Sequence, residues 1–265
     1  MSTITDPARE LSDLVRGLNI NTDALFAEGL SELFGVEAWS SEFYQIIFAI
    51  SHRVDELASI TDTLRLDDDQ RQEAKEGLRT IQMAFRPEGL LNVFNHSQRM
   101  YLSPEQIKPL SLLSAVIRPI RSYPKLDENE KADILAMVSD LLGWLEDRQL
   151  SEQDFIRQSL VEGLKQLKFR LERITWLGWG YTLQSLRDVI AAYFALERGF
   201  PRANENTSAH AMMKMLGDFV RDFFRKAGFA KDTIETGDFM LKFYGTVQLA
   251  LAGQTTIAGL LSHAS

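Results

Sequence analysis

Apolar residues recur at helical spacing through most of the chain, and the pattern is clearest between residues 151 and 199. The segment opens on Ser151-Glu152-Gln153-Asp154, which has the form of an N-terminal capping box. Apolar side chains then follow at steps of three and four: Ile156, Leu160, Leu164, Leu167, Leu171 and Ile174. This is the period of one helix face. The pattern predicts a helix of roughly 25 residues, which would be about 37 Å long.

An aromatic segment, Trp176-Leu177-Gly178-Trp179-Gly180-Tyr181, follows this helix. Gly178 and Gly180 disfavour a helix interior and tolerate a positive φ, so the segment is predicted to end the helix. A second helix is predicted from about Leu183 to Arg198. We interpret the aromatic side chains as a packed corner that locks the two helices. The alternative is a stacking platform for a flat ligand, supported by the basic residues Lys165, Lys168, Arg170 and Arg173 upstream.

The rest of the chain shows the same helical period, and no stretch alternates like a strand over more than a few residues. Helices are predicted to begin near Ser40, Asp67, Ser103 and Asp127, where capping residues or Ser-Pro precede apolar stripes. In the helix after Ser40, Ile46 and Phe48 widen the apolar stripe, so we expect much of it to be buried. The sequence therefore predicts an all-α fold, a bundle of about ten helices, several of them long, with a C-terminal helical hairpin.

The domain organisation follows from the breaks between these helices. Residues 1–208 are predicted to form a helical core domain, with a possible internal boundary at the basic, proline-bounded loop 118–126. Residues 209–265 are predicted to form a C-terminal helical hairpin packed on that core. The three aspartates Asp67, Asp68 and Asp69 are interpreted as a helix cap, because they lack the spacing of a calcium loop.

The last predicted helix, Phe239 to Leu261, contains one charged residue, Lys242. A segment of 23 apolar-rich residues is long enough to span a bilayer, but its threonines, glutamines and glycines favour a core or interface helix. A membrane-active C-terminus is therefore the alternative, in which residues 209–262 insert in a bilayer. The side chains that would then contact lipid or a partner are Phe219, Phe223, Phe224, Phe239 and Phe243.

The composition of the chain restricts the cellular compartment and the classes of partner that we expect. The chain has 265 residues and no cysteine, which excludes disulfides, thiol catalysis and cysteine-ligated metals. Without a basic, apolar leader at its N-terminus, the protein is expected to be cytoplasmic. Residues 1–150 carry 15 Lys and Arg against 25 Asp and Glu, a net charge of −10, while residues 151–265 carry +2. The acidic half argues against binding nucleic acid, which needs phosphate neutralisation.

Catalytic motifs are missing from the sequence. The four histidines at 52, 96, 210 and 263 are scattered, and neither a glycine-rich phosphate loop nor a His-Glu-x-x-His motif occurs. The polar cluster around His96 and Arg99, with the aromatic residues Trp176, Trp179 and Tyr181, is the candidate ligand-binding region. We expect no catalytic residue, no metal site and no cofactor.

The leading functional hypothesis is a non-catalytic cytoplasmic helical protein that binds a partner protein or self-associates. The first alternative is the membrane-active effector described above. The second is an enzyme or ligand binder with a pocket near His96 and the segment Trp176–Tyr181.

Overall fold

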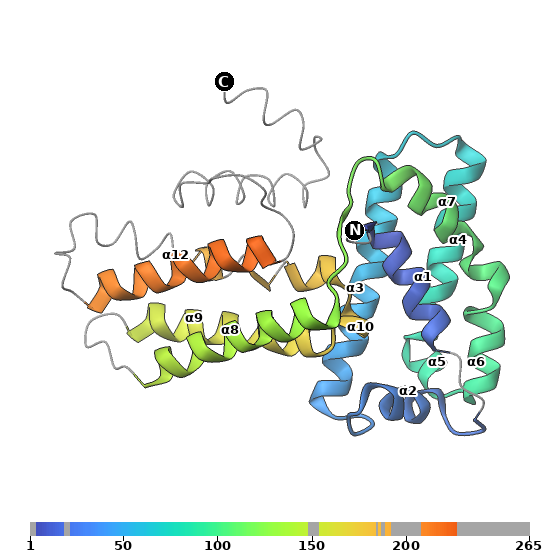
Figure 1. Ribbon diagram of the computed structural model, residues 1–265. Helices are drawn as coiled ribbons and strands as arrows, with labels where there is room; N and C mark the ends of the chain where they lie inside the picture. The colour runs from blue at the N-terminus through green and yellow to red at the C-terminus, as the bar shows by residue number, and fades with distance from the viewer. Residues whose placement is uncertain are drawn as a thin grey trace. The chain divides into compact units, whose positions relative to one another are not determined.

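The computed structural model describes residues 4–18, 22–147, 154–183, 185–186, 189–191 and 208–226. These residues form an all-α fold, which confirms the predicted class (Figure 1). The chain divides into two compact units. The N-terminal unit contains Thr5–Ser122 and Arg173–Gly178, and the C-terminal unit contains the remaining residues. The passage between Ser122 and Tyr123 lies within the loop 118–126.

The N-terminal unit is a bundle in which α1, α3, α4 and α7 pack along one another (Figure 1). Short helices close its end, and α10 packs on α3 from a distant part of the sequence. Its helices are α1 (Pro7–Gly17), α2 (Phe26–Phe34), α3 (Ser41–Thr63), α4 (Asp68–Ala84), α5 (Pro87–Leu90), α6 (Phe94–Tyr101), α7 (Pro104–Ile117) and α10 (Ile174–Leu177).

Helix α3 packs against α1, α4 and α10 through one apolar face. Phe43, Ile46, Ile50 and Leu57 are each at most 1% exposed on that face. Burying a side chain of this kind stabilises the fold by about 1.5–3 kcal/mol relative to leaving it in water. The prediction that Ile46 is buried is confirmed.

The expectation for Phe48 is wrong: its side chain is 69% exposed. Phe48 lies five residues from Phe43 and two from Ile46, which places it on the opposite side of a helix that turns by 100° per residue. Among the described residues of this unit, no helix packs over that side. The wide apolar stripe of α3 predicted a wide buried face, but the neighbouring helices cover only part of that stripe.

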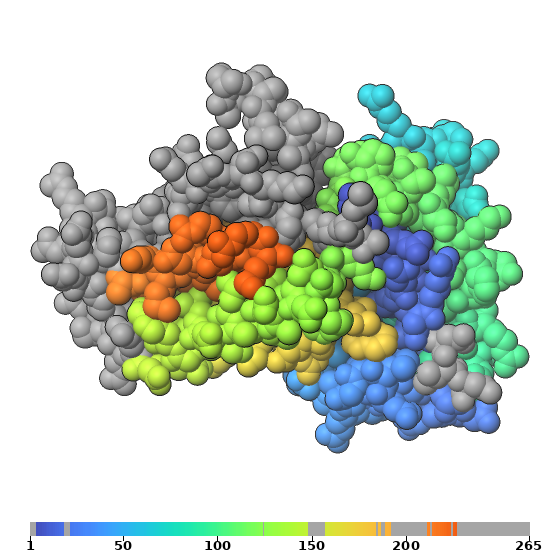
Figure 2. All heavy atoms as spheres, in the orientation of Figure 1, coloured from blue at the N-terminus to red at the C-terminus, as the bar shows by residue number. Residues whose placement is uncertain are grey.

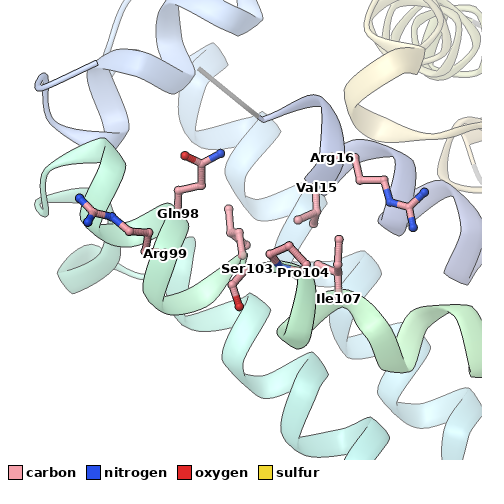
Figure 3. Close-up of a pocket in the computed structure, with 8 residues that line it drawn as sticks. Val15, Arg16, Gln98, Arg99, Ser103, Pro104 and Ile107 are labelled. Carbon is pink, nitrogen blue, oxygen red and sulfur yellow. The ribbon is translucent and has the colours of Figure 1, made fainter. Parts of the chain in front are cut away.

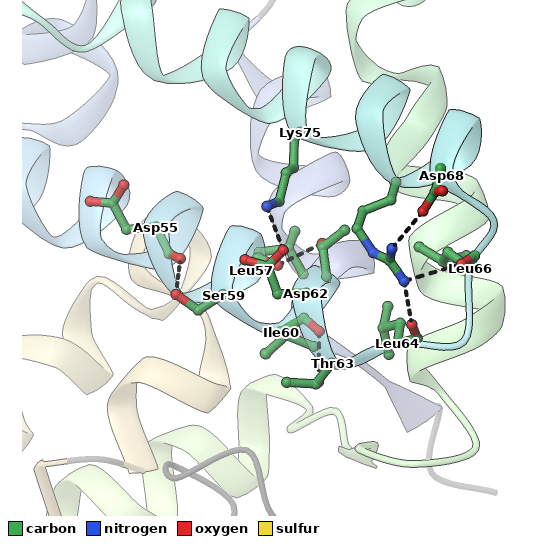
Figure 4. A network of polar contacts seen from close by, with 12 residues as sticks. Asp55, Leu57, Ser59, Ile60, Asp62, Thr63, Leu64, Leu66, Asp68 and Lys75 are labelled. Atoms are coloured by element: carbon green, nitrogen blue, oxygen red, sulfur yellow. Dashed lines mark hydrogen bonds and ion pairs between the residues drawn. The ribbon is translucent and has the colours of Figure 1, made fainter.

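Helix caps follow the sequence closely at the junction of α3 and α4. The side chain of Asp67 accepts a hydrogen bond from the backbone N–H of Gln70 at 2.8 Å, which confirms the capping interpretation. Arg71 donates to the carbonyl oxygens of Leu64 and Leu66 and pairs with Asp68, and Lys75 pairs with Asp62 (Figure 4). These contacts use the aspartates for helix ends and ion pairs, so they fix the turn instead of forming a cation site.

The C-terminal unit is built on two long helices, α8 (Glu128–Glu146) and α9 (Asp154–Glu172), which pack against each other. Helix α12 (Ser208–Lys226) lies along α8, as Figure 2 shows, and Lys226 pairs with Asp133 there. The short strands β1 (Ile4–Thr5) and β2 (Tyr123–Pro124) pair with each other. Leu160, Leu164, Leu167 and Leu171 are all fully buried, so the apolar stripe predicted for this helix is confirmed at these four positions.

The boundaries after α9 differ from the prediction. The helix ends at Glu172, α10 follows, and helical backbone resumes at Trp179, four residues before the predicted start of the next helix. The break is at Gly178, with φ +79°. A Cβ atom there would lie 2.6 Å from both Arg53 Nη2 and Glu10 Oε2, so glycine is required by conformation and by space.

Gly180 has a different role from the one predicted. Its φ is not positive, and it lies within helical backbone. A Cβ atom at Gly180 would lie 2.6 Å from the hydroxyl oxygen of Tyr123, so the glycine permits close approach of an aromatic ring. The predicted helix Phe239–Leu261, and with it most of the predicted hairpin 209–265, falls outside the described residues.

Candidate functional site

The residues of the predicted ligand-binding region are divided between the two units. His96 and Arg99 lie three residues apart on α6, where both are exposed. Trp176 belongs to α10 in the same unit, whereas Trp179 and Tyr181 belong to the C-terminal unit. Two indoles that are only three positions apart in the sequence therefore pack in different units.

Trp176 packs inside the N-terminal unit. Its ring lies 5.2 Å from that of Phe34, and its backbone carbonyl oxygen accepts a hydrogen bond of 2.7 Å from Arg53 Nη1. The buried guanidinium of Arg53 also pairs with Glu10, at 3.7 Å. All of these partners come from the chain itself, so the cluster fixes α10 on α3.

Trp179 and Tyr181 pack inside the C-terminal unit. Trp179 is 2% exposed and stacks on Phe223, with centroids 5.8 Å apart and an interplanar angle of 24°. The guanidinium of Arg170 lies 4.1 Å above the ring of Tyr181 and donates to its carbonyl oxygen at 3.0 Å. The face of Tyr181 that could stack on a base is thus taken by a side chain of the protein.

The phenylalanines considered as membrane contacts are partly described. Phe219 and Phe223 are buried on the inner face of α12, beside Trp179. The side chain of Phe224, and Phe239 and Phe243, lie outside the described residues. Among the helices that the structure describes, none combines the length and the apolar character needed to cross a bilayer.

The strongest candidate surface was not predicted, and we call it the α3 aromatic face: Trp39, Tyr44 and Phe48. Trp39 and Tyr44 are each 39% exposed, and Phe48 is 69% exposed. The ring of Tyr44 lies between the other two. Its centroid is 6.2 Å from that of Trp39 and 6.2 Å from that of Phe48. Buried Phe43 supports the first two rings from below. Contiguous exposed apolar surface of this kind is a feature that interaction sites share.

The backbone at Trp39 holds this face in a costly conformation. Trp39 has φ +64°, and it is the one non-glycine residue with a positive φ in the part of the chain that the structure describes. A left-handed conformation costs a bulky residue on the order of 1–2 kcal/mol. Such strain tends to be kept where a side chain must be presented in a fixed position.

The sequence around the face is acidic. Between Arg16 and Arg53 the chain carries five carboxylates and no lysine or arginine. Glu37 is exposed two residues before Trp39, while Glu42 pairs with Arg173 at 2.8 Å. A cation-free segment of this length was the signal in the sequence that could have located this surface.

Other chemistry was sought in the described residues. They contain no group of three His, Asp or Glu side chains that could hold a metal ion. The sequence matches no protein-family model, no curated protein and no solved structure. A proposal for this chain therefore depends on its own surfaces.

Proposed function

We propose that this protein is a non-catalytic helical binding protein that uses the α3 aromatic face to hold a positively charged segment of a partner protein. The observation that carries the proposal is the contiguous exposed run formed by Trp39, just before α3, and by Tyr44 and Phe48 on one side of α3. The cysteine-free composition suits a reducing compartment such as the cytoplasm.

Aromatic side chains support this use for energetic reasons. Tryptophan and tyrosine dominate binding hot spots, because they supply a large contact area with few rotatable bonds. Each ring already contacts its neighbour, so little side-chain entropy remains to be lost when a partner binds. A face of this kind is preorganised.

The charge of the segment indicates the chemistry of the partner. Arginine and lysine side chains bind over aromatic rings, with about 0.5–1 kcal/mol at exposed sites and more when water is excluded. Exposed carboxylates such as Glu37 would add long-range attraction and speed the association. An acidic partner would be repelled by the same charges.

The direct test uses fluorescently labelled amphipathic helical peptides made of leucine and arginine, and matched peptides of leucine and glutamate. We expect the full-length protein to bind the arginine peptide, measured by fluorescence anisotropy, and to bind it less tightly as salt is raised. The double variant Tyr44→Ser/Phe48→Ser should lose this binding. Ile120→Ser, which removes an apolar residue that is 50% exposed elsewhere in the same unit, should keep it.

Capture from host cells extends the test to a natural partner. A photo-crosslinking residue at position 48 should trap a protein through a Lys- or Arg-rich segment, and Tyr44→Ser in the same bait should abolish the product. The proposal would be refuted if the protein bound the arginine and glutamate peptides equally tightly. It would also be refuted if Tyr44→Ser/Phe48→Ser and Ile120→Ser bound the arginine peptide equally tightly. If light scattering shows a dimer that Tyr44→Ser/Phe48→Ser dissociates, the occupant is a second copy of the chain, and the proposed partner is wrong.

A further inference from the structure

A pocket of about 430 Å³ opens between α1, α6 and the start of α7 in the N-terminal unit. Figure 3 shows its lining: Val15 and Arg16 from α1, Gln98 and Arg99 from α6, and Ser103, Pro104 and Ile107 at the start of α7. The volume is at the lower end of the range of about 300–1,000 Å³ that small-molecule sites occupy. It suits a small ligand better than a dinucleotide.

The floor of the pocket is apolar. Val15, Leu102 and Ile107 line it, and each is at most 9% exposed. These three side chains come from α1, from the residue that ends α6, and from α7, so the packing of three helices shapes the floor. An apolar group placed there would be removed from contact with water, which favours binding.

Two arginines stand at the rim. Figure 3 places Arg16 and Arg99 at opposite ends of the pocket, with both guanidinium groups directed outward. Both side chains are exposed, and exposed side chains change rotamer within nanoseconds. Arg99 donates from Nε to the carbonyl oxygen of Asn95 at 3.0 Å. Within the described residues, neither guanidinium pairs with a carboxylate.

Carboxylates close by in the sequence are already engaged. Asp13 pairs with Arg9 at 3.1 Å. Glu105 accepts hydrogen bonds from its own backbone N–H and from the hydroxyl of Ser103, which hold the pKa of Glu105 below its ordinary value. Glu105 therefore stays ionised at the start of α7, where its hydrogen-bond partners are its own backbone N–H and Ser103 and not Arg16 or Arg99.

We propose that this pocket binds a small amphipathic anion, whose apolar body lies on Val15 and Ile107 and whose carboxylate or phosphate group is held by Arg16 or Arg99. The guanidinium fork offers paired N–H donors that match either group. Rotation of one exposed arginine about its side-chain bonds brings that fork over the pocket. The site is independent of the α3 aromatic face.

The experiment titrates octanoate, octyl phosphate and octanol into the full-length protein labelled at its valine and isoleucine methyl groups. We expect saturable shifts of the Val15 and Ile107 methyl signals with octanoate, octyl phosphate or both, and binding of octanol at least about tenfold weaker. The two anions distinguish a carboxylate ligand from a phosphate ligand. The double variant Arg16→Gln/Arg99→Gln should weaken anion binding by a similar factor.

Arg79→Gln is the matched control, because Arg79 is an exposed arginine on α4 that does not line the pocket. It should leave binding unchanged, and circular dichroism should show that all variants keep their helical content. Octanol binding as tightly as both anions would overturn the proposal. So would an equal loss of affinity in Arg79→Gln, or the absence of saturable methyl shifts with either anion.

Discussion

Two aromatic clusters of similar composition have opposite exposure in this protein. Trp179, Phe219 and Phe223 are buried between helices of the C-terminal unit, with Trp179 stacked on Phe223. Trp39, Tyr44 and Phe48 contact one another just as closely, yet they remain on the surface of the N-terminal unit. Aromatic contact by itself therefore does not identify a core, and the exposed cluster is the one available for binding.

The largest loss of stability is expected when the buried cluster is disrupted. Trp179→Ala should lower the free energy of unfolding by about 3–5 kcal/mol, because it removes a fully packed ring and leaves a cavity. Urea denaturation followed by circular dichroism measures the change. A loss below about 1 kcal/mol would show that the ring is not packed in the folded protein, and would remove the contrast between the clusters.

The second prediction isolates the backbone strain at Trp39. Trp39→Gly should be more stable than Trp39→Ala by about 1 kcal/mol, because glycine adopts a positive φ without a Cβ penalty. Both variants lose the same ring, so their difference in unfolding free energy reports the Cβ penalty at positive φ, less the extra conformational entropy of glycine in the unfolded chain. If Trp39→Ala is the more stable of the two, the residue does not hold this φ in solution.

The third and smallest effect on stability is expected for Phe48. Phe48→Ser should change the free energy of unfolding by no more than about 0.5 kcal/mol, because most of the ring is already in water. The same urea experiment measures it, with Trp179→Ala as the reference. A loss of 2 kcal/mol or more would mean that another part of the chain covers Phe48, and the α3 aromatic face would not be free to bind.

Local sequence rules located much of the fold. The buried leucines of α9 follow the three-and-four spacing, and Asp67 caps α4 as expected. Asp127 and Glu130 form the complete capping box of α8. These features depend on residues within one or two turns of each other, so they are visible without knowledge of the packing.

The candidate sites could be predicted from the sequence less well than the fold. Arg99 was a predicted site residue, and it does line a pocket. The second arginine of that pocket is Arg16, which is 83 positions away in the sequence and could not be paired with Arg99 from the sequence. Phe48 was predicted to be buried because it widens an apolar stripe, and Trp39 and Tyr44 were not singled out in the sequence. The predicted pocket near His96 and the segment Trp176–Tyr181 remains a prediction. His96 and Trp176 belong to the same unit, whereas Trp179 and Tyr181 belong to the other.

By itself, the sequence determined the helical class, the helix caps at Asp67 and Asp127 and the helix break at Gly178, because each follows from spacing and backbone conformation over a few residues. Only the tertiary structure decided which side of α3 is covered, and to which core each indole of the segment Trp176–Tyr181 belongs. The reason is that periodicity gives the apolar face of a helix, whereas burial depends on whether another helix packs against that face.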